Sequence, residues 1–263
     1  VDWSRDVTGQ AVVKPAGDYT VVGQSVPRRD LPAKVAGAAY LHDFAPNDIL
    51  HARTLRQPGR GAALADLNET AIRKAAGGEI EIVREGNFVA FVGPDELATE
   101  RAAVAAAELA RWDNVRDIDP ALGEGASLRD LPAIDRELGA PVDPNLGGPI
   151  FEATFSRPYV AHASMGPSCA LARFEAGHLQ LWSHGQGMHA LRRNVAQVLG
   201  LAPEAVSARH MDGPGCYGHN GADDAALDAA LVAMRKPGRV IRLQWRREEE
   251  FGYEPVGPAM LVR

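Results

Sequence analysis

A glycine-rich loop at residues 213–221 (Gly-Pro-Gly-Cys-Tyr-Gly-His-Asn-Gly) has the composition best suited to contact a ligand. The sequence pattern predicts a strand before it at 205–210 and a helix after it at 222–234. Glycines let the backbone approach a ligand and adopt positive φ, and the start of a helix offers free N–H groups with a partial positive charge. The loop therefore favours an anion, typically a phosphate.

The alternative is a loop that only turns the chain and caps the following helix through Asn220, Asp223 or Asp224. Known phosphate motifs do not decide between the two. No Lys-Ser/Thr follows the loop, so it is not a P-loop, and the absence of GxGxxG disfavours a Rossmann nucleotide site.

Two other segments carry polar side chains that could do chemistry. In residues 182–189, Gln186 could donate an amide hydrogen to an oxygen ligand, or it could cap a helix or face solvent. Residues 162–169 hold a histidine and hydroxyls, but no G-x-S-x-G surrounds Ser164, so a hydrolase using His162 and Ser164 is a remote alternative.

Bulk composition excludes several classes of function. The formal net charge of -6 and pI of 5.8 give no field for holding nucleic acid or anionic lipid. Cys169 and Cys216 have no CxxC partners, which disfavours a disulfide scaffold or a zinc or iron–sulfur site built from them alone. Cys169 runs into an alternating strand and is expected to be a buried structural thiol. The sequence contains no apolar run of the ~20 residues that span a bilayer.

The elements that must position these residues suggest an α+β protein. In the first part we expect a strand at 49–55, a short helix ending near 77–78, a hairpin of 79–83 with 87–92, and a helix at 94–110. Residues 113–148, with four prolines and five glycines, are the best linker candidate.

The second part begins near Ile150 with a short strand at 152–155. It continues with three elements: a hairpin of 168–174 with 179–183, a helix at 187–199 and a strand at 240–245. The run Arg246-Arg247-Glu248-Glu249-Glu250 is typical of a solvated helix start.

Taken together and in this order, five segments resemble the large subunit of molybdenum hydroxylases, the xanthine dehydrogenase/aldehyde oxidase family. The segments are residues 22–37, 162–170, 182–186, 213–224 and 244–249. The most similar branch is the bacterial isoquinoline 1-oxidoreductase/nicotinate dehydrogenase type. Each motif alone is modest, but five in the right order are specific, and they favour the ligand-binding interpretation of the glycine loop.

The resemblance implies a fold and a division of the chain. We expect an N-terminal extension at 1–19, an a/b hammerhead-like domain at 20–112, the linker at 113–148, and the first molybdopterin-binding domain at 149–263. It implies an N-terminal part of a longer subunit that ends before the family's catalytic glutamate. No residue here matches that glutamate, and the glutamates at 248–250 are not assigned its role.

The resemblance also implies a cofactor, partners and a reaction. In the full subunit the cofactor is molybdenum held by a molybdopterin, in bacteria usually the cytosine dinucleotide form, with no protein side chain directly on the metal. Whether this fragment alone carries the cofactor is left open by the sequence. The reaction is hydroxylation of an N-heteroaromatic ring or oxidation of an aldehyde, with water as oxygen source. Electrons leave through an iron–sulfur subunit, and in this branch often reach a cytochrome c. The implied compartment is the bacterial cytoplasm or the periplasmic face of the inner membrane.

Within this chain the resemblance assigns cofactor contacts and no catalytic residue or metal ligand. Gln186 matches the glutamine that donates to an oxygen on molybdenum, and Tyr217 and Gly218 match a pair that offers backbone N–H groups. The full set of expected cofactor-binding residues is Gln186, Gly215, Cys216, Tyr217, Gly218, His219 and Asn220. We expect the chain alone to lack turnover.

Two departures favour the named branch over enzymes acting on xanthine. Gly166 stands where many relatives have a glutamate, and Gly-Cys-Tyr-Gly at 215–218 stands where Gly-Gly-Phe-Gly is common. The competing hypothesis is a non-catalytic, cofactor-free binding or assembly module that contacts a partner protein of the same complex, which an exposed apolar patch would favour.

Overall fold

The computed structural model describes residues 4, 6, 8–140 and 147–263, which belong to two compact units. The first ends at Ala39 and the second is residues 40–263. In the first unit the described helices are the 3-10 turn η1 (Ala16–Asp18) and the short α1 (Leu31–Val35), and neither has a buried residue. Pro32 lies in the first turn of α1, a position that proline favours.

One seven-stranded mixed sheet organises the second unit, in the order β3-β4-β1-β10-β7-β8-β9. β1 with β10 and β8 with β9 are parallel, and the other neighbours are antiparallel. The strands are β1 (Ile49–Leu55), β3 (Glu81–Glu85), β4 (Phe88–Gly93), β7 (Cys169–Glu175), β8 (His178–Ser183), β9 (Val206–His210) and β10 (Val240–Gln244). The expected hairpins and the α+β class are confirmed.

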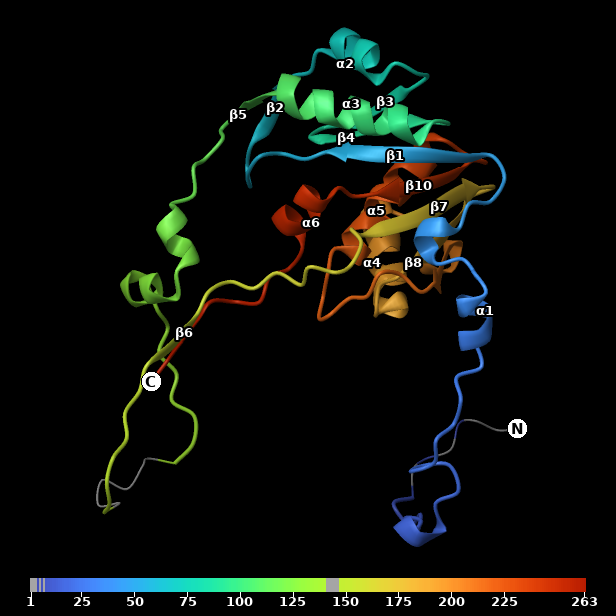
Figure 1. Ribbon diagram of the computed structural model, residues 1–263. Helices are drawn as coiled ribbons and strands as arrows, with labels where there is room; N and C mark the ends of the chain where they lie inside the picture. Colours follow the sequence, from blue (N-terminus) through green and yellow to red (C-terminus); the bar gives the residue numbers. More distant parts are fainter. Residues whose placement is uncertain (1–3, 5, 7, 141–146) are drawn as a thin grey trace. The chain divides into compact units, whose positions relative to one another are not determined.

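Helices cover both faces of the sheet (Figure 1). Successive side chains of a strand point to opposite faces. In β1, Ala52 packs towards α4 (Met188–Leu199) and α5 (Ala222–Arg235), and Leu55 packs towards α2 (Glu69–Ala76) and α3 (Glu96–Leu109). Alanines fill the inner sides of α3 and α5, which lets both helices lie close to the strands.

The parallel pair of β1 and β10 joins the two halves of the sequence. Ile49 lies opposite Val240 and Ala52 opposite Leu243. The sheet therefore runs without a break through both the segment expected to be hammerhead-like and the segment expected to bind cofactor (Figure 1). The expected domain boundaries stay a prediction.

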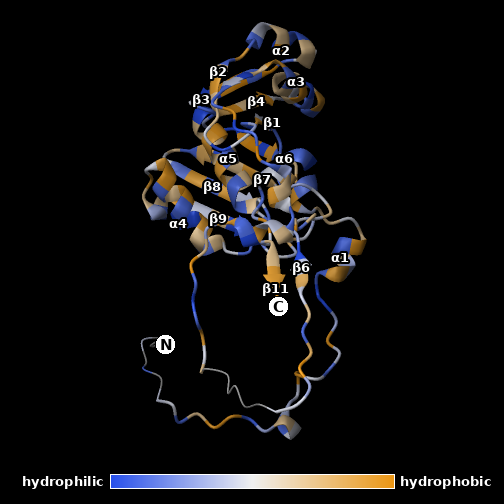
Figure 2. Cartoon of the chain, turned by 90° about the vertical axis from the view of Figure 1, so that its left-hand side faces the viewer, coloured by the Kyte–Doolittle hydropathy of each residue, from blue (hydrophilic) through white to orange (hydrophobic). Residues whose placement is uncertain are grey.

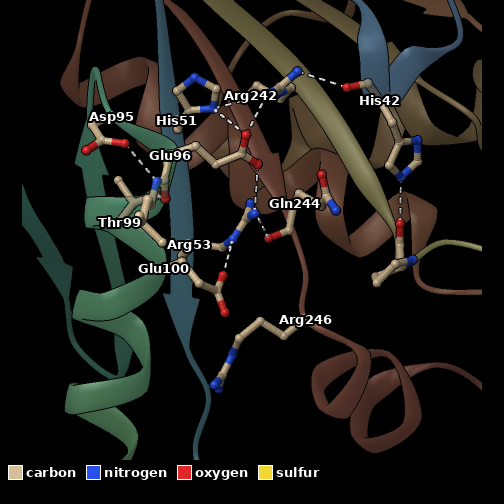
Figure 3. A network of polar contacts seen from close by, with 12 residues as sticks. His42, His51, Arg53, Asp95, Glu96, Thr99, Glu100, Arg242, Gln244 and Arg246 are labelled. Carbon is tan, nitrogen blue, oxygen red and sulfur yellow. Dashed lines mark hydrogen bonds and ion pairs between the residues drawn. The ribbon is translucent and has the colours of Figure 1, made fainter. Parts of the chain in front are cut away.

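Buried charges fix α3 to the sheet (Figure 3). Arg53 of β1 donates to Glu100 at 2.6 Å, to Glu96 at 2.9 Å and to the Gln244 carbonyl at 3.2 Å. Arg242 of β10 reaches the same Glu96 carboxylate at 3.0 Å. Two guanidinium groups thus share one carboxylate, so each buried charge is paired.

Shorter elements complete the second unit. They are η2 (Leu41–Asp43), β2 (Ala63–Asp66), β5 (Arg111–Asp113), η3 (Pro120–Gly123), η4 (Gly125–Asp130), β6 (Phe155–Arg157), η5 (Pro203–Ala205), α6 (Arg247–Tyr253) and β11 (Met260–Val262). β2 pairs with β5, and β6 with β11. The strand expected at 152–155 begins only at Phe155, where β11 supplies a partner.

The expected linker has no strand of the main sheet in its described part, residues 113–140 and 147–148. Residues 141–146 lie outside the described residues. β11 is apolar in Figure 2, and Met260 and Val262 are exposed although large and hydrophobic. Among the described residues, no helix has both the length and the apolar character that a bilayer crossing requires.

Candidate functional site

The glycine loop leaves β9 at His210 and enters α5 at Ala222, as the sequence predicted. Tyr217 has φ +53° and Gly218 φ +140°, so the loop crosses backbone regions that side chains disfavour. A Cβ on Gly218 would lie 2.3 Å from His162 Nε2, closer than any real side chain tolerates. Glycine is required here because the backbone both adopts a positive φ and rests on the His162 ring.

Asn220 holds the loop together from inside. It is 2% exposed. Its side-chain nitrogen donates to the Gly215 carbonyl at 3.2 Å, and its oxygen accepts the Ala222 N–H at 3.2 Å and the Cys216 thiol at 3.4 Å. The Asn220 amide is thus used within the protein, where its oxygen accepts the N–H of the first residue of α5, and its expected cofactor contact stays a prediction.

The turn that carries Gln186 lies against the start of α5. Gly185 donates its N–H to the Ser183 hydroxyl at 3.1 Å, and that hydroxyl lies 3.4 Å from the Ala222 carbonyl. A Cβ on Gly185 would be 2.4 Å from Asp223 Oδ1, so the two segments are in close contact. Gln186 itself is exposed. The two segments that the sequence singled out therefore meet at the first turn of α5.

His162 contacts the glycine loop through its ring. Its Nε2 accepts the His219 N–H at 3.1 Å. Its own backbone N–H donates to Glu254 Oε1 at 2.8 Å, and Nδ1 lies 3.6 Å from Glu254 Oε2. Because Nε2 is an acceptor, a neutral His162 carries its proton on Nδ1, facing the carboxylate.

The acidic run at 248–250 was expected to be a solvated helix start, and that expectation is wrong for two of its residues. Glu249 is 3% exposed and Glu250 is 0% exposed. Glu249 accepts the Thr54 hydroxyl at 2.5 Å and the Arg246 N–H at 2.7 Å. Burial is possible because donors from distant segments surround these carboxylates. Only Glu248 of the three is exposed.

A hollow of about 580 Å³ opens beside the glycine loop. Three segments far apart in sequence line it: Tyr40 and His42, Met165 and Gly166, and Gly213, Pro214, Gly215 and Tyr217. Of the predicted cofactor-binding residues, Gly215 and Tyr217 belong to this lining, whereas Gln186 and Gly218 do not. These eight lining residues carry no carboxylate or guanidinium.

Burial keeps the histidines around the hollow neutral. It lowers the pKa of His42, whose Nε2 lies 2.8 Å from the Pro167 carbonyl. It also lowers the pKa of His184 to about 4, and the neighbouring His42 and His210 act in the same direction. His184 Nε2 accepts the Cys169 N–H at 3.3 Å. These two histidines therefore add little positive charge beside the hollow at neutral pH.

Asp223, in the first turn of α5 beside Gly185, has a carboxylate oxygen without a hydrogen-bond donor in the described part of the chain. Its Oδ1 is buried and has no hydrogen-bond partner among the described residues. Burial raises its pKa, while the nearby His219 opposes the shift. An oxygen of this kind is suited to receive an N–H or O–H group from a ligand.

Sequence reasoning missed the supporting residues of the site. His42 has no pattern around it, and Glu250 and Glu254 lie in a run that reads as surface charge. The only sequence signal for these buried carboxylates was the run of acidic residues directly after a buried strand. That signal becomes informative only when hydrogen-bond donors are known to lie near the run.

Comparisons with known proteins agree with this geometry. Residues 148–263 match a family described as the molybdopterin cofactor-binding domain. The chain is 35% identical over 271 residues to a subunit of nicotinate dehydrogenase from Pseudomonas putida, covering 97% of this chain and 22% of that protein. It is 26% identical over 275 residues to the beta subunit of isoquinoline 1-oxidoreductase from Brevundimonas diminuta, covering 97% and 34%. The chain thus spans 22% and 34% of the length of these relatives.

Solved structures share the fold. Quinoline 2-oxidoreductase from Pseudomonas putida 86 matches with a TM-score of 0.64 at 18% identity, over 89% of this chain and 36% of that chain. Aldehyde oxidoreductase from Desulfovibrio gigas matches with a TM-score of 0.63 at 16% identity, over 88% and 31%.

Proposed function

Since residues 148–263 belong to the molybdopterin cofactor-binding domain family, we propose that this chain forms one wall of the molybdenum–pterin site of a hydroxylase. The resemblance expected from the sequence is confirmed: the chain is a relative of molybdenum-hydroxylase large subunits along 97% of its length. The observation that carries the proposal is the contact of the Gln186 turn with the first turn of α5, directly after the glycine loop, at Gly185 and Asp223.

The residues present fit a pterin. A pterin ring carries N–H donors, and Asp223 Oδ1 is a buried acceptor without a donor among the described residues. The N–H groups of Tyr217 and Gly218 have no acceptor in the described part of the chain, so they are available to a bound oxygen or nitrogen. Gln186 is exposed and can donate an amide hydrogen.

The start of α5 fits a phosphate less well. The Gly221 N–H is already used by Glu250, and Ala222 N–H by Asn220. Asp223 and Asp224 both lie in the first turn, where a carboxylate takes the place of an anionic ligand. We therefore infer that the pterin ring, rather than the pyrophosphate of a cytosine dinucleotide form, lies beside this helix start.

When bound, the cofactor supplies the oxidation that hydroxylates a carbon with water as oxygen source. The residues of this chain bind and orient it: Gln186 and the loop amides as donors, Asp223 as acceptor. Neutral His42 and the apolar lining of the hollow hold an uncharged reactant. No proton-abstracting base is assigned within residues 1–263, and we propose that it comes from the rest of the subunit.

The substrate class we propose is an N-heteroaromatic ring or an aldehyde, and the partners are an iron–sulfur subunit and a cytochrome c. The names of two relatives, subunits of nicotinate dehydrogenase and isoquinoline 1-oxidoreductase, support the substrate class and the presence of other subunits. The iron–sulfur and cytochrome c identities of those partners rest on the family resemblance alone. The alternative of a cofactor-free assembly module is not favoured, because the matched relatives and fold neighbours are named as oxidoreductases or dehydrogenases.

The test is the molybdenum content and pterin release of the assembled enzyme that contains this chain, compared with the same enzyme carrying Gln186→Ala. We expect stoichiometric molybdenum in the wild type, and an about tenfold loss of cofactor affinity in the variant, the size of one charge-assisted hydrogen bond. Gln197→Ala, an exposed glutamine on α4, is the matched control and should keep full content. Wild-type protein without molybdenum or pterin would contradict the proposal.

A further inference from the structure

α6 presents three charged side chains to the loops of the site. Arg247, Glu250 and Glu254 are spaced by three and four residues, which places them on one side of the helix and its last turn. Each contacts a different point of the segments at 162–168 and 218–221.

Glu250 joins the start of β7 to the end of the glycine loop. It is fully buried. Its Oε2 accepts the Ser168 N–H at 2.6 Å, while Oε1 accepts the Ser168 hydroxyl at 3.0 Å and the Gly221 N–H at 3.2 Å. One carboxylate therefore supplies acceptors to two backbone amides 53 positions apart, and no water is needed to satisfy them.

Glu254 acts on the loop through His162. Its side chain is 0% exposed. It accepts the His162 backbone N–H and faces the Nδ1 edge of the ring. This arrangement keeps Nε2 free to accept the His219 N–H. The glycine loop is thus held at His219 by His162 and at Gly221 by Glu250.

Arg247 fixes the facing turn. Its guanidinium donates to the Ser164 carbonyl at 2.7 Å and to the Met165 carbonyl at 3.0 Å. Met165 and Gly166 line the hollow opposite the glycine loop. The same side of α6 therefore holds the turn at 164–166 and the end of the glycine loop, two of the three segments that contribute to the lining of the hollow.

We propose that this side of α6, Arg247–Glu250–Glu254, is a clamp that positions the glycine loop and the facing turn for the cofactor. Glu250, Glu254 and His162 are positioning residues that do not touch the cofactor. The inference rests on the proposed function for the identity of the ligand. The clamp is defined by the acceptors that it supplies to three backbone amides, those of Ser168, His219 and Gly221.

Loss of a clamp should increase local opening near the lost contacts, whereas loss of a general stabilising contact affects the whole fold. Removing an acceptor leaves the Ser168, His219 or Gly221 amide unpaired, so opening should be local to Ser168 and to residues 213–222. In Glu250→Gln, an NH₂ group replaces one oxygen and must face an N–H donor in either orientation. At least one of the Ser168 and Gly221 amides then loses its acceptor.

The experiment is residue-resolved hydrogen exchange on the purified protein, with molybdenum content measured on the same samples. We expect the Ser168 or Gly221 amide in Glu250→Gln to exchange about tenfold faster or more, the effect of one lost bond to a charged acceptor. Molybdenum content should fall, while amides in β1 and β4 keep their rates. Glu248→Gln, on the same helix but exposed, is the control and should change neither.

A second pair of variants covers the case in which Glu250→Gln does not fold. His162→Gln keeps an oxygen near the Nε2 position, whereas His162→Leu has no acceptor. We expect the His219 amide to exchange at about the wild-type rate in His162→Gln and about tenfold faster in His162→Leu, with molybdenum content following the same order. A purely steric role for His162 would give the same result for both.

Two results separate this clamp from the proposed function. Wild-type protein that lacks molybdenum removes the cofactor assignment, yet the exchange rates still report on the clamp. Unchanged exchange at Ser168, His219 and Gly221 in Glu250→Gln and His162→Leu, or equal exchange in both His162 variants, overturns the clamp even when wild-type molybdenum is stoichiometric.

Discussion

The Arg242 guanidinium donates to the backbone carbonyl of His42 at 2.8 Å, across 200 positions of the sequence. The same side chain binds the Glu96 carboxylate (Figure 3). His42 lines the hollow, so the charges that fix α3 to the sheet also fix one wall of the site.

Replacing Arg242 by methionine should therefore destabilise the fold and loosen that wall. The variant keeps most of the apolar stem of the side chain but loses three partly buried bonds, to His42, His51 and Glu96. We expect the free energy of unfolding to fall by about 2 kcal/mol, the range for hydrogen bonds to charged groups. Urea unfolding measures the change.

Arg235→Met is the matched control. Arg235 pairs with Glu85 at 2.8 Å, and both side chains are more than half exposed. Exposed pairs contribute about 0–1 kcal/mol. Equal losses in the two variants would show that the Arg242 contacts add nothing beyond an ordinary surface pair.

Stability should decline as the pH falls below neutrality because of His184. Burial lowers its pKa from 6.5 to about 4 in the folded protein. Between those values the unfolded chain binds a proton that the folded chain does not, so stability is present above pH 6.5 and is lost as the pH falls towards 4. Each such proton gives a slope of about 1.4 kcal/mol per pH unit.

Urea unfolding at pH values between 6.5 and 5 tests this expectation. His184→Gln keeps an acceptor for the Cys169 N–H but cannot titrate. The slope of the unfolding free energy against pH should therefore decrease by the contribution of about one proton. His42, whose pKa burial also lowers, leaves a remaining slope of the same sign. A slope that His184→Gln does not change would contradict the assignment.

The two thiols should differ sharply in reactivity. Cys169 is 0% exposed, and burial raises its pKa to about 12. Cys216 is partly exposed in the glycine loop. Because the thiolate is the reactive form, a disulfide reagent should label only Cys216 in the folded protein and both thiols after unfolding. Cys216→Ser should abolish labelling under native conditions, and persistent labelling would contradict the burial of Cys169.

The sequence was sufficient for elements whose signal is local. The alternation in 168–174 and 179–183 and the Ala176-Gly177 turn predict the β7–β8 hairpin, because register follows from the turn and the apolar face. The β1–β10 pairing is not local, since nothing within either strand specifies a parallel partner 191 positions away. The continuous sheet could not be derived from periodicity.

The same distinction applies to the site. The glycine loop and the Gln186 turn were found from composition and from the resemblance, and the structure brings them together at Asp223. Glu250 was misjudged because the burial of a carboxylate depends on its donors. Those donors, Ser168 and Gly221, lie 82 and 29 positions away.

Gly218→Ala tests whether the glycine loop must keep its present shape. The new Cβ would lie 2.3 Å from His162 Nε2, on a residue whose φ is +140°. The loop must then move away from His162, and the His219 N–H loses its acceptor. We expect a folded protein with little bound molybdenum, since the loop amides of Tyr217 and Gly218 move with the backbone.

Gly61→Ala separates the contact from backbone strain. Gly61 also has a positive φ, +90°, but a Cβ there meets nothing within 4 Å. Both variants should lose about 1 kcal/mol of stability from the unfavourable φ, while only Gly218→Ala should lose molybdenum. If Gly218→Ala retains full molybdenum while its His219 amide exchanges faster, the cofactor does not depend on this part of the loop, and its contacts must be sought around Gln186 and Asp223 instead.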